Sequence, residues 1–359
     1  SVAFTAPTDA GTSAITGFVV QVASSGDNYS AGSNTGSSSP IVVSSLTNGT
    51  AATAKVWAIN AYGTSAPSDA SSSFTPVSPI GLFGGIDHGG IGSYVGIEKI
   101  TISSTGNSTD VGDLSESRNG LGSCSSSTRC VFVGGTATMD YVDFASLGNA
   151  TDFGDLGNSA AGASAASNST RGIVTRFDDI YYITIASTGN SSTFGNWGEN
   201  RTDAGMCSND TRAVIAGGGS GNQTMDYVTI ATTGSQTSFG NITGIYHNNA
   251  NGVVSNSTRG IFAGGFSSNV GGHTNKIAYI TIASTGNGTD FGDLTASRYQ
   301  LASCSNTIRG TFAGGLSSSK HNTIDYITIA STGNASDFGD LTTNEASRIT
   351  GASNTHGGL

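Results

Sequence analysis

Charged residues, prolines and helix-forming residues are all scarce in this sequence. Only 11% of the 359 residues are charged, and all five prolines lie before position 80. Glu and Lys occur four times each and Met three times, whereas Gly, Ser, Thr and Asn, which favour turns, are abundant. Together with frequent Thr, Val and Ile, this composition predicts an all-β protein.

Other absences narrow the range of partners. The formal net charge is −10, so the basic surface that nucleic-acid binding requires is missing, and we expect no nucleic-acid partner. No apolar run approaches the roughly 20 residues of a membrane-spanning helix, so we expect no membrane insertion. Because 36% of the residues are hydrophobic, including 15 Phe and 11 Tyr, the chain has enough apolar surface to fold.

The composition changes after Pro79, which divides the chain. Pro76 and Pro79 cannot donate to a strand ladder, so we expect a short, stiff linker over residues 77–79. The sequence therefore predicts one domain over residues 1–76 and a second over residues 80–359. Because the first residue is Ser1 rather than Met, we also expect a piece of a longer polypeptide.

The first domain contains alternating stretches over residues 15–22, 41–46 and 52–59, separated by turns, as in a small β-sandwich. The segments Leu46–Thr50 and Lys55–Ser68 resemble the second half of a fibronectin type III domain. Two departures are that Ala52 stands where that family places a tyrosine and that the chain starts at the equivalent of the second strand. The edge exposed by the missing first strand implies a longer parent chain or a cover from elsewhere.

The second domain repeats one unit six times. An aromatic residue in phrases like Thr-Asp-Phe-Gly-Asp-Leu recurs every 41 to 52 residues, at Phe153, Phe194, Phe239, Phe291 and Phe338, with Val111 in its place in the first unit. An arginine that opens a hydrophobic strand recurs every 41 to 50 residues, at Arg129, Arg171, Arg212, Arg259 and Arg309. Such periods in an all-β composition predict four-stranded propeller blades.

Each repeat unit is predicted to contain the second, third and fourth strands of one blade, followed by the first strand of the next blade. We refer to these positions as strands one to four. In the fifth unit these are Gly260–Gly265, Tyr279–Ser284 and Asp290–Leu294, followed by Tyr299–Ser305. The first unit begins with a type-two strand over residues 81–85, and a lone type-one strand lies over residues 348–353. The C-terminal strand is therefore predicted to complete blade 1 and close a six-bladed ring.

The Gly-Gly pair after strand two, the tyrosine of strand three, the aromatic of strand four and the arginine resemble the kelch family of propellers, with Phe in place of the usual Trp. The Asn-Ala-Thr-Asp-Phe-Gly-Asp-Leu phrases are also similar to those of appendage and tail-fibre proteins of marine bacterial viruses, particularly viruses of cyanobacteria. This resemblance implies a virion or extracellular location and a homo-oligomer. It also implies, as partners, other virion structural proteins or a host-surface glycan or protein.

Several repeated residues have structural explanations. Cys124, Cys207 and Cys304 share a strand-one position and are interpreted as small core residues, with a Cys124–Cys130 disulfide as an alternative. The Asp-x-Gly-Asp turns offer two carboxylates each, too few for calcium, so we expect no metal and pairing with the periodic arginines, which we interpret as ties between blades. The repeated Asn-x-Ser/Thr sequons are interpreted as turn residues, and as glycan acceptors only in a eukaryotic secreted protein.

Catalytic motifs are missing from the sequence. It contains no His-Glu-x-x-His, no phosphate-binding glycine loop and no nucleophile elbow, so we expect neither an enzyme nor a cofactor. The resemblance to viral appendage proteins implies a virion appendage or tail-fibre protein for display and host attachment. The alternatives are a bacterial secreted or cell-surface adhesin and, less favoured, a carbohydrate-active enzyme.

Loop length indicates where a partner would bind. Between strands two and three, 14, 14 and 11 residues separate the Gly-Gly and Tyr positions in units 1, 5 and 6, against 5 to 9 elsewhere. Closure would make these units neighbours, so their loops would crowd one sector of one rim, unless the lengths vary neutrally. The candidate binding residues are His88, Tyr94, His273, Asn275, Lys320 and His321.

Overall fold

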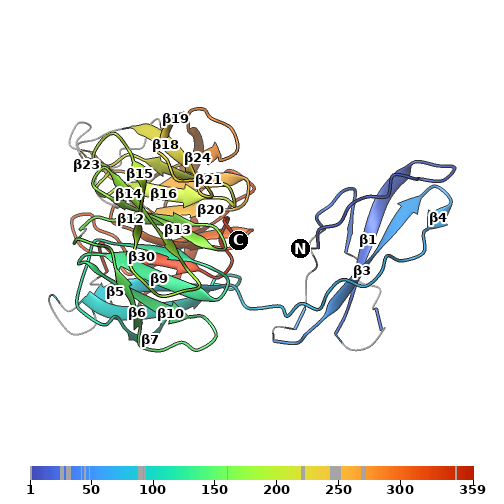
Figure 1. The fold of residues 1–359 in the computed structure, drawn as a ribbon, viewed down its shortest axis with the longest axis horizontal. Helices are drawn as coiled ribbons and strands as arrows, with labels where there is room; N and C mark the ends of the chain where they lie inside the picture. The colour runs from blue at the N-terminus through green and yellow to red at the C-terminus, as the bar shows by residue number, and fades with distance from the viewer. Residues whose placement is uncertain are drawn as a thin grey trace. The chain divides into compact units, whose positions relative to one another are not determined.

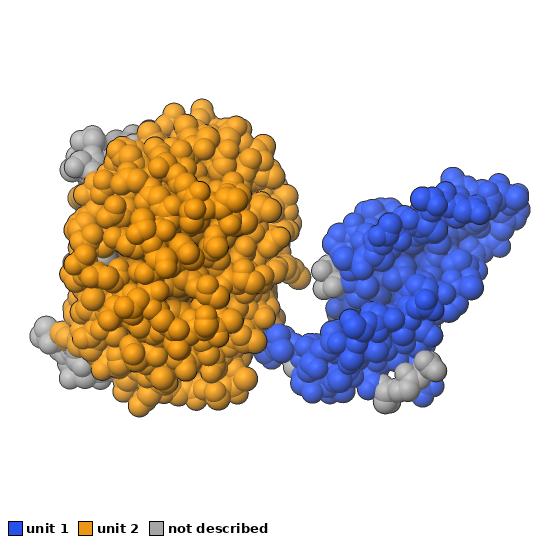
Figure 2. Space-filling view, in the orientation of Figure 1, with its two compact units in different colours: residues 1–78 blue, residues 79–359 orange. Residues whose placement is uncertain are grey.

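The computed structural model divides the chain into two compact units, residues 1–78 and 79–359 (Figure 2). The residues that it describes are 2–24, 28–29, 34–41, 43, 46–47, 49–87, 92, 94–159, 161–219, 223–242, 252–267, 272–343 and 346–359. All regular elements in these ranges are strands, so the predicted all-β class is confirmed. Accordingly, these ranges hold no helix long and apolar enough to cross a membrane.

The first unit contains one antiparallel sheet in the order β2-β1-β3-β4, of which Figure 1 labels β1, β3 and β4. Its strands are β1 (Ile15–Ala23), β2 (Thr35–Gly36), β3 (Thr53–Asn60) and β4 (Gly63–Thr64). The strand expected over residues 41–46 is present only as a bridge between Val2 and Ile41, and residues 42, 44 and 45 lie outside the described ranges. Phe18, Val20 and Ile41 are buried in the core of this unit.

Serines cover the edge of β3 beyond β4. Ser65, Ser68 and Ser71 each donate a backbone N–H to a carbonyl of β3, at 2.9 Å. Their hydroxyls accept from the backbone N–H groups of the same β3 residues, at 3.0–3.1 Å. A serine at every third position thus matches every second residue of β3, and each serine pairs with both polar backbone groups of its partner.

The second unit contains six four-stranded antiparallel sheets. Sheet 1 consists of β30 (Thr350–Ser353), β5 (Ile80–Asp87), β6 (Tyr94–Thr101) and β7 (Thr109–Asp113). Sheet 2 consists of β8 (Leu121–Ser125), β9 (Arg129–Gly134), β10 (Thr138–Asp143) and β11 (Thr151–Asp155). Sheet 3 consists of β12 (Ser164–Ser167), β13 (Arg171–Arg176), β14 (Asp179–Thr184) and β15 (Ser192–Asn196).

The other three sheets follow the same order. Sheet 4 consists of β16 (Gly205–Ser208), β17 (Arg212–Ala216), β18 (Thr224–Thr229) and β19 (Thr237–Asn241). Sheet 5 consists of β20 (Gly252–Ser255), β21 (Arg259–Ala263), β24 (Lys276–Thr281) and β25 (Thr289–Asp293), and a small hairpin of β22 (Phe266–Ser267) and β23 (Gly272–His273) lies within its long loop. Sheet 6 consists of β26 (Ala302–Ser305), β27 (Arg309–Ala313), β28 (Thr323–Thr328) and β29 (Ser336–Asp340).

The C-terminal strand β30 pairs with β5 and places Gly351 opposite Phe83, so the predicted pairing of these two segments is confirmed. The first strand of each sheet, here called an inner strand, contacts the inner strands of the two neighbouring sheets. The contacts follow the order β8, β12, β16, β20, β26, β30 and return to β8. Sheets from opposite ends of the sequence thereby become neighbours.

Several strand boundaries differ from the prediction by one to three residues; for example, β26 was expected to begin at Tyr299 but begins at Ala302. The third strand of sheet 5 was expected over residues 279–284 but spans Lys276–Thr281. Its pairing with β25 begins at Lys276, opposite Asp293, so the ladder extends before Tyr279 and ends where the Ser284 turn begins.

The periodic arginines join neighbouring sheets, as expected. In five sheets the strand-three tyrosine packs edge-on against the strand-four phenylalanine, with ring centroids 6.1–6.2 Å apart. The arginine lies 4.0–4.7 Å from the centroid of the same tyrosine. Arg171, for example, donates to the carbonyls of Ile230 and Ala231 in sheet 4, at 2.8 and 3.0 Å. The expected pairing with the Asp-x-Gly-Asp turns is wrong for Arg129, whose ion partner is Asp143 in β10.

The sequon asparagines do more than form turns. In five of them the Oδ1 atom accepts from a strand-four backbone N–H of a neighbouring sheet, at 2.9–3.1 Å, whereas Oδ1 of Asn168 and of Asn256 accepts from within its own turn. The asparagines concerned are Asn107, Asn149, Asn190, Asn287 and Asn334. The donor is usually the second aspartate of an Asp-x-Gly-Asp turn, such as Asp113 for Asn149, so this turn serves as an attachment point between sheets.

The cysteines occupy the core, as predicted. All four are buried free thiols, so Cys124 and Cys130 form no disulfide. Cys124 packs against Gly172 of the neighbouring sheet so closely that a Cβ on Gly172 would lie 2.6 Å from its sulfur. Burial raises the pKa of the Cys124 thiol to about 12, which keeps it protonated and unreactive.

Candidate functional site

The second unit has two different faces, because the inner strands all end at the same side. We call the side with the tight turns between strands one and two and between strands three and four the turn face. The side with the connections between strands two and three and between strand four and the next strand one is the loop face. The candidate residues of units 1, 5 and 6 belong to the loop face.

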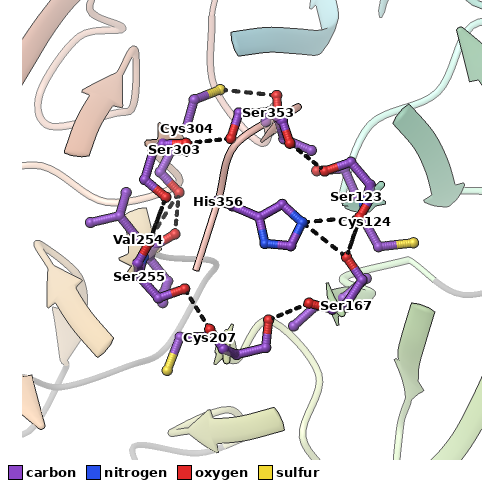
Figure 3. Close-up of a pocket in the computed structure, with 18 of the residues that line it drawn as sticks. Ser123, Cys124, Ser167, Cys207, Val254, Ser255, Ser303, Cys304, Ser353 and His356 are labelled. Carbon is purple, nitrogen blue, oxygen red and sulfur yellow. Dashed lines mark hydrogen bonds between the residues drawn. The ribbon is translucent and has the colours of Figure 1, made fainter. Parts of the chain in front are cut away.

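At the turn face, the six inner strands each end in a serine: Ser125, Ser167, Ser208, Ser255, Ser305 and Ser353. Each hydroxyl donates to the carbonyl of the serine on the preceding inner strand, with O···O distances of 2.5–2.9 Å. The sixth bond, from Ser125 to Ser353, closes the circle (Figure 3). All six residues are buried, and every hydroxyl proton is used.

His356 projects into this serine ring (Figure 3). Its Nε2 lies 3.0 Å from the Ser125 carbonyl oxygen, and its Nδ1 accepts from the Gly358 backbone N–H, also at 3.0 Å. Because a carbonyl only accepts, we assign the proton to Nε2 of a neutral imidazole. Burial lowers the pKa of His356, which is consistent with the neutral form. His356 therefore fills the centre of the cycle of inner strands at the turn face. We call the line through this centre the axis.

Two small cavities lie on the axis between the inner strands. One of about 60 Å³ borders the serine ring, and one of about 70 Å³ lies toward the loop face. A single layer separates them, with one residue from each inner strand: Ser123, Ala165, Met206, Val253, Ser303 and Gly351. Because one water occupies about 30 Å³ of the liquid, each cavity suits a few waters but no sugar ring.

The predicted loop-face residues form two groups. His273 stacks on Tyr299 with ring centroids 6.4 Å apart, and Phe266 lies 5.3 Å from the same tyrosine. Separately, the Lys320 ammonium lies 5.9 Å from the centre of the Tyr94 ring, which joins sheets 6 and 1. His88 lies outside the described residues. Tyr299 and Phe266 were missed because both were interpreted only as parts of strands or loops.

His321 and Asn275 help to hold the loops in place. Nε2 of His321 lies 2.8 Å from the Ser317 hydroxyl, and the Asn275 carbonyl accepts from the Leu294 N–H at 2.7 Å. Partial burial lowers the pKa of His321, and the charges of Arg298 and His273 add to this effect. His321 is therefore neutral near pH 7, and His273 and His321 are close enough to interact.

Buried ion pairs lie beneath the loop face in sheets 2, 4 and 6. They are Arg118–Asp140, Arg201–Asp226 and Arg298–Asp325. Arg298 and Asp325 are fully buried and 2.8 Å apart, and Arg298 also donates to the carbonyls of Gly314 and Thr323, each at 2.8 Å. These bonds fix both ends of the long loop of sheet 6. The pairs therefore have a clear structural role.

Five described residues, each just before an inner strand, surround the axis at the loop face. Gly120, Gly162, Asp203, Gln300 and Arg348 occupy equivalent positions, and all have left-handed backbone angles, with φ from 58° to 72°. Backbone N–H groups of Gly120, Gly162, Asp203 and Arg348 donate to the carbonyl of another member, at 2.9–3.3 Å. The equivalent residue before β20 lies outside the described ranges. We call these five residues the axial mouth.

Within the described ranges, no group of three or more His, Cys, Asp or Glu side chains is arranged to hold a metal ion. No protein-family model matches the chain, and no curated protein is significantly similar in sequence. The functional argument therefore depends on the geometry of the two faces.

Proposed function

We propose that the second unit is a six-bladed, kelch-like β-propeller and that the first is a fibronectin type III-like sandwich. Three features support the propeller: six sheets of four strands, the pairing of β30 with β5, and inner-strand contacts that return to their starting point. The sheet of the first unit and the bridges from Val2 to Ile41 and from Ala52 to Phe74 are compatible with the sandwich.

We propose further that the protein is a non-enzymatic virion appendage or tail-fibre protein that attaches to a host-surface glycan or protein. The observation that carries this proposal is the contrast between the two faces. The serine ring and the asparagine and arginine ties recur on the turn face, whereas the loop face varies in loop length and in exposed side chains. A rigid scaffold with variable loops on one side suits recognition, and many copies on one particle would strengthen weak contacts.

Competition for host cells tests this function. The purified full chain, added in excess, is expected to reduce adsorption of the parent virus. A variant in which Leu316–Asn322 is replaced by a short turn such as Phe177–Asp178 of sheet 3 should compete less well. Gold-labelled antibody against the chain should mark the virion. Labelling of a bacterial surface without particles would instead support an adhesin, and turnover on a glycan panel would support an enzyme.

A further inference from the structure

The axial mouth contains backbone conformations that its side chains do not favour. Gly120 and Gly162 show that glycine meets the backbone requirement in two repeats. Asp203, Gln300 and Arg348 adopt the same left-handed conformation, which residues with a Cβ rarely adopt. The fold alone does not explain why three polar side chains stand at these positions, because glycine suffices. Conformational strain of this kind clusters at binding sites.

These three side chains also lack partners in the described part of the chain. The Gln300 residue is only 6% exposed, yet its amide makes no hydrogen bond there. Asp203 and Arg348 are half-buried, and neither forms an ion pair or a side-chain hydrogen bond within the described ranges. None of their polar atoms is among the fully buried side-chain atoms that lack a partner, so these groups reach solvent and can contact a ligand.

The three residues stand at different places around the axis. Asp203 precedes β16 and Arg348 precedes β30, which lie three places apart in the cycle of inner strands and therefore on opposite sides. Burial raises the pKa of the Asp203 carboxyl, and the charge of Arg348 opposes this rise. The guanidinium therefore acts on the carboxylate across the mouth. Gln300 precedes β26, the inner strand next to β30, and its backbone carbonyl accepts from the Arg348 N–H at 3.3 Å.

Glycine leaves room for the carboxylate. A Cβ on Gly162 would lie 2.5 Å from Oδ1 of Asp203, so the carboxylate rests directly over this glycine. Gly120 lies beside Gly162, and neither places a side chain over the axis. Among the described residues of the mouth, Gln300 and Arg348 therefore stand on neighbouring strands on one side of the axis, and the Asp203 carboxylate lies on the other.

We propose that the axial mouth binds an acidic sugar unit, a pyranose with one carboxylate and several hydroxyls. The Arg348 guanidinium pairs with the sugar carboxylate, the Asp203 carboxylate accepts from a hydroxyl, and the Gln300 amide donates to one oxygen and accepts from another. The ring rests on the mouth because the cavity below is too small for it. The choice of a sugar over an amino acid rests on the proposed role in host attachment.

Calorimetric titration of the full chain with D-glucuronic acid, and with D-glucose as the neutral match, tests the site. Glucuronic acid is expected to bind at least tenfold more tightly than glucose. Arg348→Gly should abolish this preference, and Asp203→Gly should weaken binding of glucuronic acid at least tenfold. Both variants introduce glycine, which already occupies the equivalent positions 120 and 162, so their melting temperatures should not fall. Arg176→Ala, which removes an arginine on the same face but outside the mouth, should leave binding unchanged.

Three outcomes would overturn the assignment. The first is no binding of glucuronic acid by the unmodified chain, and the second is binding that survives Arg348→Gly. The third is tighter binding of L-alanine than of glucuronic acid, which would identify an amino-acid site. These outcomes are separate from the test of function. Glucuronic acid binding without competition for host cells would contradict host attachment alone, whereas competition without sugar binding would contradict only the axial site.

Discussion

The turn face and the loop face are built from the same six repeats, yet they differ in how their polar side chains are hydrogen-bonded. At the turn face, all six inner strands end in serine, and each serine makes the same hydrogen bond to its neighbour. At the loop face, the equivalent position is filled by Gly, Gly, Asp, Gln and Arg in the five described repeats, and the three polar side chains have no partner among the described residues.

This difference shows how function can be distinguished from structure in a repeat protein. A position that meets the same physical requirement in every repeat needs the same residue, and Ser255 or Ser305 illustrates this at the turn face. A position where glycine suffices in two repeats but polar residues appear in three meets an additional requirement. Comparison between repeats of one chain therefore identifies the axial mouth, even though neither the length nor the composition of the chain does.

The largest effect is expected from the buried ion pair that supports the loop face. Asp325→Ala leaves the Arg298 guanidinium, whose side chain is 0% exposed, without its charge partner. We expect the free energy of unfolding to fall by about 3–5 kcal/mol, measured by urea denaturation. Asp179→Ala, which removes the more exposed partner of Arg176, is the control and should cost no more than about 1 kcal/mol. Equal losses would contradict the structural role of the buried pair.

The next effect tests the turn face. Ser255→Ala removes a buried hydroxyl that donates to the Ser208 carbonyl at 2.8 Å and so opens the serine ring. We expect a loss of about 1–3 kcal/mol in the free energy of unfolding, because a buried carbonyl is left unpaired. Ser257→Ala, at an exposed site two residues away, provides the matched control and should have almost no effect. If both variants unfold alike, the ring contributes nothing to stability.

The stability of the turn face is expected to depend on pH through His356. Burial holds the pKa of His356 below its unfolded value near 6.5, so the unfolded chain binds the proton more readily. The stabilising effect of neutral His356 is complete above that pH and is lost as the pH falls, by up to about 1.4 kcal/mol per pH unit.

Urea denaturation at pH 7.5 and 5.5 measures this loss. His356→Gln should lose less stability on acidification than the unmodified chain, and all other titrating groups are common to both proteins. An identical pH dependence would show that His356 does not remain neutral in the ring.

The smallest effect is expected from one asparagine tie. Asn149→Ala removes the acceptor of the Asp113 N–H at 3.1 Å, in an exposed position. We expect a loss of about 0.5–1.5 kcal/mol in unfolding free energy. Asn334→Ala removes the equivalent bond to Asp293 and should cost a similar amount, because the turn face repeats. A large difference between the two variants would show that the repeats are not energetically equivalent.

Much of the fold was predictable because it depends on local patterns. The spacing of Phe153 and its equivalents predicted where strand four recurs, and the unpaired segment at residues 348–353 predicted the partner of β5. The small core position of Cys124 was also predictable, since alanine and valine replace it in other repeats. The start of β24 was missed because Lys276 and Asp293 extend the ladder through a contact that strand propensity does not encode.

The sites were less predictable. His273 and Lys320 were identified from loop length, but their aromatic neighbours Tyr299 and Tyr94 were paired with them only by the structure. The serine ring was missed because its members resemble the many other serines of the chain. Asp203 and Gln300 carried no signal, since left-handed backbone angles are unexpected at residues other than glycine.

The sequence by itself determined the all-β class, the repeat length and the partner of the last strand, because strand propensity and periodic apolar residues act over short distances. Only the tertiary structure decided which polar groups are satisfied. The partners of Ser125 and Ser353 lie on other sheets, and Asp203 faces Arg348 across the axis although 145 positions separate them in the chain. A hydrogen bond depends on where two atoms meet in space, and that meeting requires all six sheets to be in place.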